Sequence, residues 1–285
     1  MKKKLIAGLL VGAMAVSLSG CGASKTEEAP AAGDSAAEET AEAEPVTLNV
    51  FAAASMTETL TEIQEMYKDV APNVTLVFNF DSSGTLKTQI QEGADCDLFI
   101  SAAQKQMNQL DKDADPEANT EGLDYVLEGT RVNLLENKVV LAVPDGNPKN
   151  IESFEDLGTD KLSLLALGNE DVPVGQYSIE ILTNLGIFDS LEDEGKITYG
   201  SNVKEVTTQV SEAAADAGII YATDAFSAGL TVVDQAEGDL CKQVIYPAAV
   251  LNISKNPEAA KEFLAYLQTD TCMQVFEAVG FTAAE

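Results

Sequence analysis

Four short segments place a small or polar residue where an apolar run of strand length gives way to a helical pattern. They are Ser55, Ser82 with Ser83, Val174 with Gly175, and Asn202 with Val203. The first amides of a helix lack partners within the helix, and its aligned peptide dipoles place partial positive charge there. Four such starts, if they converge, could hold a dianion without a cationic side chain. Taken singly, each is explained as well by a residue that only caps its helix.

The sequence offers few residues for catalysis or for metal binding. The chain has no histidine, which removes the usual general base, the usual metal ligand and every Ser-His or Cys-His nucleophile. Carboxylates are numerous, but no pair stands out from an acidic solvated surface. Arg131 is the one arginine, and we expect it on the surface of the first lobe defined below. We therefore expect no enzyme activity, no cofactor and no bound metal cation.

Composition limits the partners. Lys and Arg total 17 against 47 Asp and Glu, a formal net charge of -30, so nucleic acid is excluded as a natural partner. Apart from Cys21, the cysteines are Cys96, Cys241 and Cys272, without a C-x-x-C spacing. They form no disulfide framework or zinc motif, although one bridge among the three stays open.

The N-terminal segment is typical of export. Three lysines precede an apolar run that ends in Leu18-Ser19-Gly20-Cys21, which resembles the bacterial lipobox. We predict a cleaved signal peptide over residues 1–20, lipidation of Cys21, and a disordered acidic tether over residues 21–45. The alternative is an ordinary signal peptide with an incidental cysteine. Both place the protein outside the cytoplasm, and the first anchors it to the membrane.

The rest of the chain alternates strands with helices, which predicts an α/β fold. Ser55 to Glu58 and Asn202 to Glu205 match capping boxes, and residues 81–84 are predicted to form a turn. Pro173 and Gly175 are expected to precede a helix. The predicted strands are residues 46–54, 74–80, 97–101, 138–143, 161–167, 218–223 and 246–253, and the terminal helices are residues 257–267 and 271–279.

This order suits two α/β lobes joined by two crossover strands, near residues 138–143 and 246–250. We predict a two-lobed, periplasmic-binding-protein-like (type II) fold with its ligand cleft between the lobes. Lobe 1 comprises residues 46–138 and 246–285, and lobe 2 comprises residues 139–245.

Five motifs in this order resemble the molybdate-binding proteins of ABC importers, over residues 46–281. They are Phe51-Ala52-Ala53-Ala54-Ser55, Asp81-Ser82-Ser83-Gly84-Thr85-Leu86, Asp97-Leu98-Phe99-Ile100-Ser101-Ala102, Val172-Pro173-Val174-Gly175-Gln176-Tyr177 and Gly218-Ile219-Ile220-Tyr221-Ala222-Thr223-Asp224-Ala225.

The resemblance implies that molybdate or tungstate is held by serine hydroxyls, by amides at helix starts and by a tyrosine hydroxyl. The matching positions are Ser55, Ser83, Val174, Val203 and Tyr221. Each has a structural alternative: the serines as caps, the valines as core contacts, and the tyrosine as a buried strand aromatic. The resemblance also implies a permease as partner, and we expect the binding protein to be a monomer.

Two other hypotheses stay open. The same fold could bind sulfate or phosphate, and Asp81 is the candidate acceptor for the proton of hydrogen phosphate. A two-lobed surface enzyme or a scaffold is the alternative from a different class.

Overall fold

The computed structural model describes residues 44–284 of the protein. The predicted signal peptide, Cys21 and nearly all of the predicted tether lie outside this part of the chain, so they stay predictions. Within residues 44–284, no helix is both long and apolar enough to cross a membrane.

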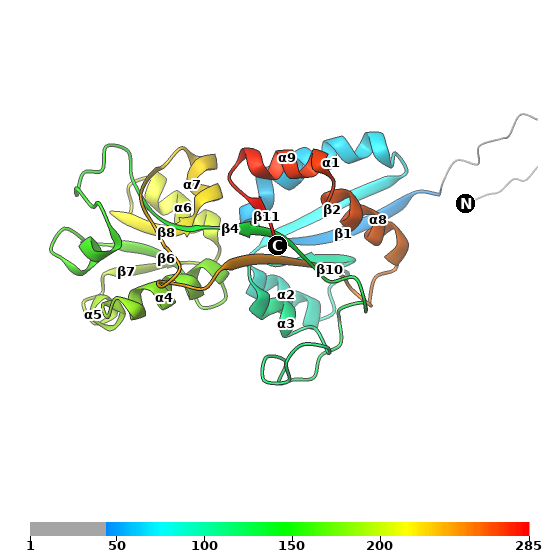
Figure 1. The fold of residues 1–285 in the computed structure, drawn as a ribbon, viewed down its shortest axis with the longest axis horizontal. Helices are drawn as coiled ribbons and strands as arrows, with labels where there is room; N and C mark the ends of the chain where they lie inside the picture. Colours follow the sequence, from blue (N-terminus) through cyan, green and yellow to red (C-terminus); the bar gives the residue numbers. More distant parts are fainter. Residues whose placement is uncertain (1–43, 285) are drawn as a thin grey trace, which may run out of the picture. The chain divides into compact units, whose positions relative to one another are not determined.

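The first of two sheets has the strand order β11-β4-β10-β3-β1-β2 (Figure 1). Strand β1 runs parallel to β2 and β3, whereas β10 is antiparallel to β3 and β4. The carboxyl ends of β1, β2 and β3 therefore meet at one edge. The strands are β1 (Val46–Ala53), β2 (Val74–Asp81), β3 (Leu98–Ile100), β4 (Val132–Asn137), β10 (Val244–Val250) and β11 (Thr282–Ala283).

Alternate residues of β1 enter two different apolar clusters, because successive strand side chains point to opposite faces. Leu48 and Val50 join the larger cluster, and Phe51 joins a smaller one with Leu86 and Phe99. Figure 1 shows the helices that cover the two faces: α1, α8 and α9 on one, α2 and α3 on the other. Their bounds, with the 3₁₀ turn η1, are η1 (Ala54–Met56), α1 (Thr57–Val70), α2 (Ser83–Gln91), α3 (Gln104–Asn108), α8 (Pro257–Leu267) and α9 (Asp270–Ala278).

The second sheet has the order β7-β6-β8-β5-β9, with β6 parallel to β7 and β8, and β5 antiparallel to β8 and β9. Its faces are covered by α6 and α7 on one side and by α4 and α5 on the other (Figure 1). The elements are β5 (Val139–Val143), η2 (Phe154–Gly158), β6 (Leu165–Gly168), α4 (Pro173–Asn184), α5 (Phe188–Asp193), β7 (Ile197–Gly200), α6 (Val203–Ser211), β8 (Ala217–Tyr221), α7 (Ala222–Ala228) and β9 (Thr231–Gln235).

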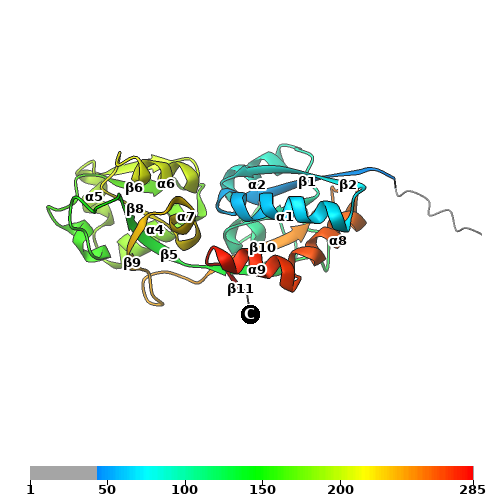
Figure 2. The ribbon, with the colours of Figure 1, turned by 90° about the horizontal axis from the view of Figure 1, so that it is seen from above.

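The chain passes between the sheets twice. Lys138 alone separates β4 from β5, and residues 236–243 separate β9 from β10. Both passages can be followed in Figure 2, where the chain enters the second sheet at β5 and returns to the first at β10.

The α/β class is confirmed, and most predicted strands form within three residues of their expected limits. Two of the expected segments were wrong in detail. The segment 161–167 becomes a strand only from Leu165, and residues 81–84 are not a turn, because β2 continues to Asp81 and α2 begins at Ser83. Strands β4, β7, β9 and β11 were not predicted. Cys96, Cys241 and Cys272 are all free, so the bridge left open by the sequence does not form.

Candidate functional site

A small cavity lies where the carboxyl ends of the strands of both sheets meet. Its empty volume, including the part open to solvent, is about 200 Å³. Four of the five predicted site residues line it, together with neighbours from the same loops. The lining residues are Ala53, Ala54, Ser55, Asp81, Ser82, Ser83, Ala102, Val172, Pro173, Val203 and Tyr221.

Ser55 is positioned by η1, not by a helix cap. The N-cap residue of α1 is Met56, without a side-chain cap, so the predicted capping box from Ser55 to Glu58 was wrong. The 3₁₀ turn moves the start of α1 to Thr57, and the Ser55 side chain is left free to bond elsewhere. Its Oγ lies 2.9 Å from the hydroxyl of Tyr246 on β10.

Ser82 and Ser83 have different roles at the start of α2. Ser82 is the N-cap residue of α2, and its Oγ accepts from the N–H of Thr85 at 3.1 Å and donates to Thr85 Oγ1 at 2.8 Å. Ser83 is fully buried, and its Oγ accepts from the N–H of Ala102 at 2.9 Å. Because that N–H can only donate, the Ser83 proton is free for another acceptor.

Helix α4 begins earlier than expected. Pro173 is its first residue and Val172 its N-cap, so Pro173 and Gly175 lie inside the helix instead of before it. Proline suits this position because its missing N–H would have no partner there. Val174 is not among the lining residues; its side chain is buried in the core, and its N–H belongs to the first turn, which lacks intrahelical acceptors.

At the start of helix α6, one of the two hydrogen bonds of the predicted capping box forms. Asn202 is the N-cap residue, and its side chain accepts from the N–H of Glu205 at 3.1 Å. The Glu205 carboxylate accepts from Ser201 at 2.7 Å, not from Asn202 as a capping box requires. Val203 is the first helical residue and lines the cavity.

Tyr221 ends β8 and is buried. Its hydroxyl donates to the carbonyl oxygen of Ala102 at a long 3.5 Å. Burial raises the pKa of this phenol well above its usual value. Tyr221 therefore keeps its proton at neutral pH and remains a donor.

Several contacts join the two lobes around the cavity. The N–H of Gly84 donates to the carbonyl oxygen of Asp171 at 3.0 Å. Lys204 Nζ lies 2.7 Å from Glu58 Oε2 and 3.0 Å from Asp224 Oδ1. The Gly84–Asp171 bond and the Lys204–Glu58 pair cross from one lobe to the other beside the cavity, whereas Lys204 and Asp224 lie in the same lobe, on α6 and α7.

Asp224 is an unusual buried carboxylate. Neither oxygen accepts a hydrogen bond of good geometry from the described residues, although Lys204 lies within ion-pair distance. Burial raises the pKa of Asp224 to about 6, against the opposing effect of Lys204.

Arg131 lies outside the cavity. Its Nη1 donates to Asp111 Oδ2 at 2.7 Å, and the guanidinium also donates to side chains of α3. The side chains that line the candidate site are therefore hydroxyl groups and apolar groups, with Asp81 as the one charged residue among them.

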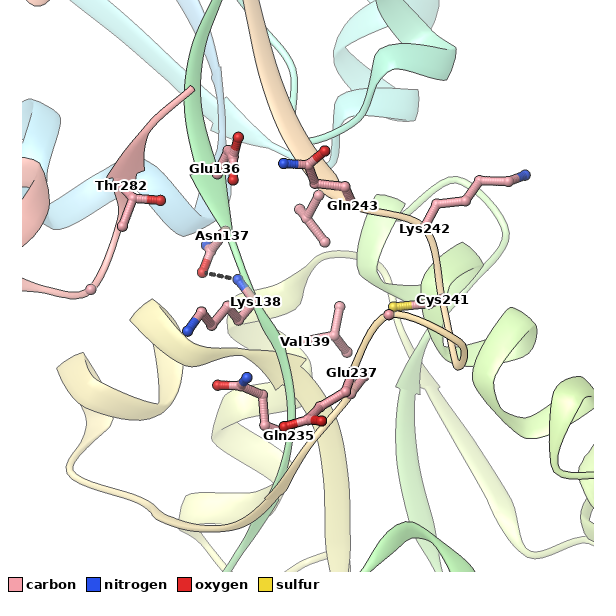
Figure 3. Close-up of a pocket in the computed structure, with 14 residues that line it drawn as sticks. Glu136, Asn137, Lys138, Val139, Gln235, Glu237, Cys241, Lys242, Gln243 and Thr282 are labelled. Atoms are coloured by element: carbon pink, nitrogen blue, oxygen red, sulfur yellow. Dashed lines mark hydrogen bonds between the residues drawn. The ribbon is translucent and has the colours of Figure 1, made fainter. Parts of the chain in front are cut away.

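A larger pocket, with an empty volume of about 1170 Å³ that also includes the part open to solvent, lies between the two segments that link the sheets (Figure 3). Side chains of both signs line it, including Glu136, Lys138, Glu237 and Lys242. None of the four helix starts contributes to it, so the smaller cavity is the candidate anion site.

Two α/β lobes that enclose a cavity of helix starts and hydroxyl groups define a solute-binding protein. Residues 48–282 match the model of the bacterial extracellular solute-binding proteins, and the chain belongs to this family. The family places the protein outside the cytoplasm, as the sequence predicted.

The resemblance to molybdate-binding proteins is confirmed. The chain is 34% identical to the molybdate-binding protein ModA of Haemophilus influenzae over 241 residues, 83% of this chain and 90% of that protein. It is 38% identical to the putative ABC transporter substrate-binding lipoprotein YvgL of Bacillus subtilis over 240 residues, 84% and 87% of the two chains.

Solved structures confirm the two-lobed fold. The substrate-binding domain of a putative molybdenum ABC transporter from Clostridium difficile is 37% identical, with a TM-score of 0.63 over 84% of this chain and 100% of that one. The periplasmic molybdate-binding protein of Azotobacter vinelandii is 21% identical, with a TM-score of 0.72 over the same shares, and supports the fold alone.

Proposed function

We propose that the protein captures molybdate or tungstate between its lobes and delivers the oxyanion to the permease of an ABC importer. The cavity itself is the main support, because hydroxyl groups and helix starts line it and no lysine or arginine does among the described residues. Relatives named for molybdate binding support the same ligand.

The proposed donors are Ser55, Ser83, Val174, Val203 and Tyr221, the valines through backbone N–H groups. Ser83 and Tyr221 can turn their hydroxyl protons toward a ligand. The Ser83 oxygen accepts from the N–H of Ala102, which leaves its proton free, and the Tyr221 proton is engaged only in a long bond to the carbonyl oxygen of Ala102. A buried dianion is tolerated only when its oxygens are fully hydrogen-bonded. Removing one donor should therefore cost about 1–3 kcal/mol of binding free energy.

Phosphate is the second candidate ligand, and the presence of Asp81 in the cavity favours it. This carboxylate lines the cavity, and its Oδ1 accepts from the N–H of Ser82 at 2.7 Å. A free carboxylate oxygen could accept the proton of hydrogen phosphate, whereas sulfate and molybdate need donors only. Sulfate is distinguished from molybdate by size.

We propose binding without chemistry, in which closure of the lobes signals the loaded state to the permease. Lobe 1 comprises residues 46–138 and 246–285, and lobe 2 comprises residues 139–245. The lipobox-like sequence at Cys21 supports a lipid anchor, and the acidic segment behind it would give the lobes room to move.

Isothermal calorimetry of the protein comprising residues 46–285 tests the ligand, with molybdate, tungstate, sulfate and phosphate at neutral pH. We expect tight binding of molybdate and tungstate, weakened about five- to 150-fold in Ser55→Ala and Tyr221→Phe. Ser211→Ala, on the exposed end of α6, and Tyr266→Phe, on α8, are the matched controls. Binding of phosphate or sulfate without molybdate would reject the assignment, and no oxyanion binding would reject the class of ligand.

A further inference from the structure

Behind the cavity, three side chains form a hydrogen-bonded chain that ends at Ser55. Asn137 Nδ2 lies 3.2 Å from the Tyr246 hydroxyl, which lies 2.9 Å from Ser55 Oγ. All three side chains are buried, and Asn137 closes β4 immediately before the chain passes to the second sheet. We call this set the Ser55–Tyr246–Asn137 relay.

A backbone N–H sets the direction of the hydrogen bonds in the relay. The N–H of Lys138 donates to Asn137 Oδ1 at 2.8 Å, a bond drawn in Figure 3. Because this N–H requires an acceptor, the carbonyl of the Asn137 amide must face it, and the NH₂ group must face the other way. There it donates to Tyr246 and, at 2.9 Å, to Thr223 Oγ1.

Tyr246 is therefore an acceptor toward Asn137 and must donate its own proton elsewhere. Its side chain is fully buried, and burial raises the pKa of its phenol well above the usual value, so the proton is present. Among the described residues, Ser55 Oγ is the acceptor within hydrogen-bond distance. A buried hydroxyl proton without an acceptor is costly, so Tyr246 donates to Ser55.

A serine oxygen that accepts from Tyr246 has its own proton free for the cavity. We propose that Asn137 and Tyr246 are positioning residues that fix the Ser55 hydroxyl as a donor and so select bare tetrahedral oxyanions over protonated ones. This inference rests on the proposed function, in which Ser55 contacts the oxyanion. The N–H of Ala102 fixes the Ser83 hydroxyl as a donor in the same way. The partners of Ser55 are side chains, however, so a substitution can reverse the direction of its hydrogen bond.

Two variants change the relay in different ways. In Tyr246→Phe the Ser55 hydroxyl loses its fixed donor and becomes free to accept a ligand proton. In Asn137→Asp the carboxylate accepts from both Lys138 and Tyr246. Tyr246 then accepts a hydrogen bond from the Ser55 hydroxyl, so the lone pairs of Ser55 Oγ face the cavity. The added negative charge weakens all dianions alike, so only a ratio of affinities reports the reversal.

The measurement is the ratio of molybdate to phosphate affinity at pH 7.5, with phosphate measured by competition against bound molybdate. In both variants we expect the ratio to fall by at least about tenfold, the worth of one misdirected hydrogen bond. Tyr67→Phe is the matched control, since Tyr67 is a buried tyrosine on α1 that packs against Phe263 and Tyr266. Its ratio should equal that of the wild type.

Damage to the fold would lower both affinities together and leave the ratio unchanged, so it cannot imitate the expected result. Should Tyr246→Phe fail to fold, the nearly isosteric Asn137→Asp decides alone. A wild type that binds molybdate, with an unchanged ratio in the variants, overturns the inference and leaves the proposed function standing. A wild type that prefers phosphate overturns both, as does one that binds neither anion.

Discussion

The N–H of Gly84 donates to the carbonyl oxygen of Asp171 at 3.0 Å, which joins the first turn of α2 directly to the loop before α4. The contact is so close that a Cβ atom at position 84 would lie 2.4 Å from that oxygen. Glycine is thus required here for the approach of two backbones, not for an unusual backbone dihedral angle.

Gly84→Ala should hinder closure and weaken molybdate binding by at least about tenfold, because the lobes must separate to admit the methyl group. Calorimetry measures the affinity, and small-angle scattering of the ligand-bound protein measures the separation. Gly238→Ala is the control, since a Cβ there meets no atom within 4 Å. Equal affinities for the two variants would contradict a role for the Gly84 contact in closure.

Asp224 should make folding stability fall with rising pH. Its pKa is about 6 in the folded protein against 3.8 for an ordinary aspartate, so between these values the folded state binds more protons than the unfolded state. The free energy of unfolding that Asp224 contributes is fully present below about pH 4 and is lost as pH rises through about 6. The total change is roughly 3 kcal/mol.

Urea unfolding of the wild type and Asp224→Asn from pH 4 to pH 7 isolates this contribution from that of other carboxylates. The variant should gain on the wild type as pH rises, with the change complete near pH 7. Lys204 and Glu58 are the charged groups that face Asp224, and both remain in the variant. Parallel stability curves would show that Asp224 titrates normally.

The ion pair between Glu58 and Lys204 crosses the cleft but should contribute little to closure. Its side chains are 49% and 30% exposed, and exposed pairs are worth about 0–1 kcal/mol. Glu58→Gln should weaken molybdate binding less than about fivefold, with a smaller effect at high salt. Glu62→Gln on the same helix is the control for a change in net charge, and a loss of a hundredfold would assign the pair a major part in closure.

Cys241 should be the first of the three described cysteines to react with a maleimide in the native protein. It is half-buried, whereas Cys96 and Cys272 are buried, and burial raises the pKa of the Cys241 thiol to about 11. Labelling should therefore be slow at pH 7 and about tenfold faster at pH 8, because the thiolate is the reactive form. Mass spectrometry of labelled peptides from residues 46–285 identifies the site, and equal labelling of Cys96 would refute the order.

The sequence predicted those elements whose side-chain pattern is decided by burial. Strand β1 and helix α1 were predicted because Leu48, Val50, Leu60 and Ile63 all enter the core. Strands β7 and β9 lie at the edges of the second sheet, and no residue of β9 is fully buried, so no continuous apolar run marked these strands. Strand β4 ends in Glu136 and Asn137, polar residues whose partners come from distant segments.

The sequence predicted which strand-to-helix junctions form the candidate site, but not the hydrogen bonds that their side chains make. Ser82 and Asn202 cap their helices, a local property that the sequence shows. Ser55 does not, because η1 intervenes and its partner Tyr246 is 191 residues away. The tyrosine carried no signal beyond its place in a predicted strand, so the sequence missed both it and Asn137.

The burial of the Ser55–Tyr246–Asn137 relay also has a consequence for the entropy of capture. Its side chains are already ordered by bonds on β4 and β10, so the conformational freedom of the Ser55 hydroxyl is lost during folding rather than during binding. An arriving oxyanion then meets a donor that needs no reorientation, and the entropy cost of capture falls mainly on the movement of the lobes. Variants that loosen the relay should accordingly bind with a less favourable entropy, even where they retain the same number of hydrogen bonds to the ligand.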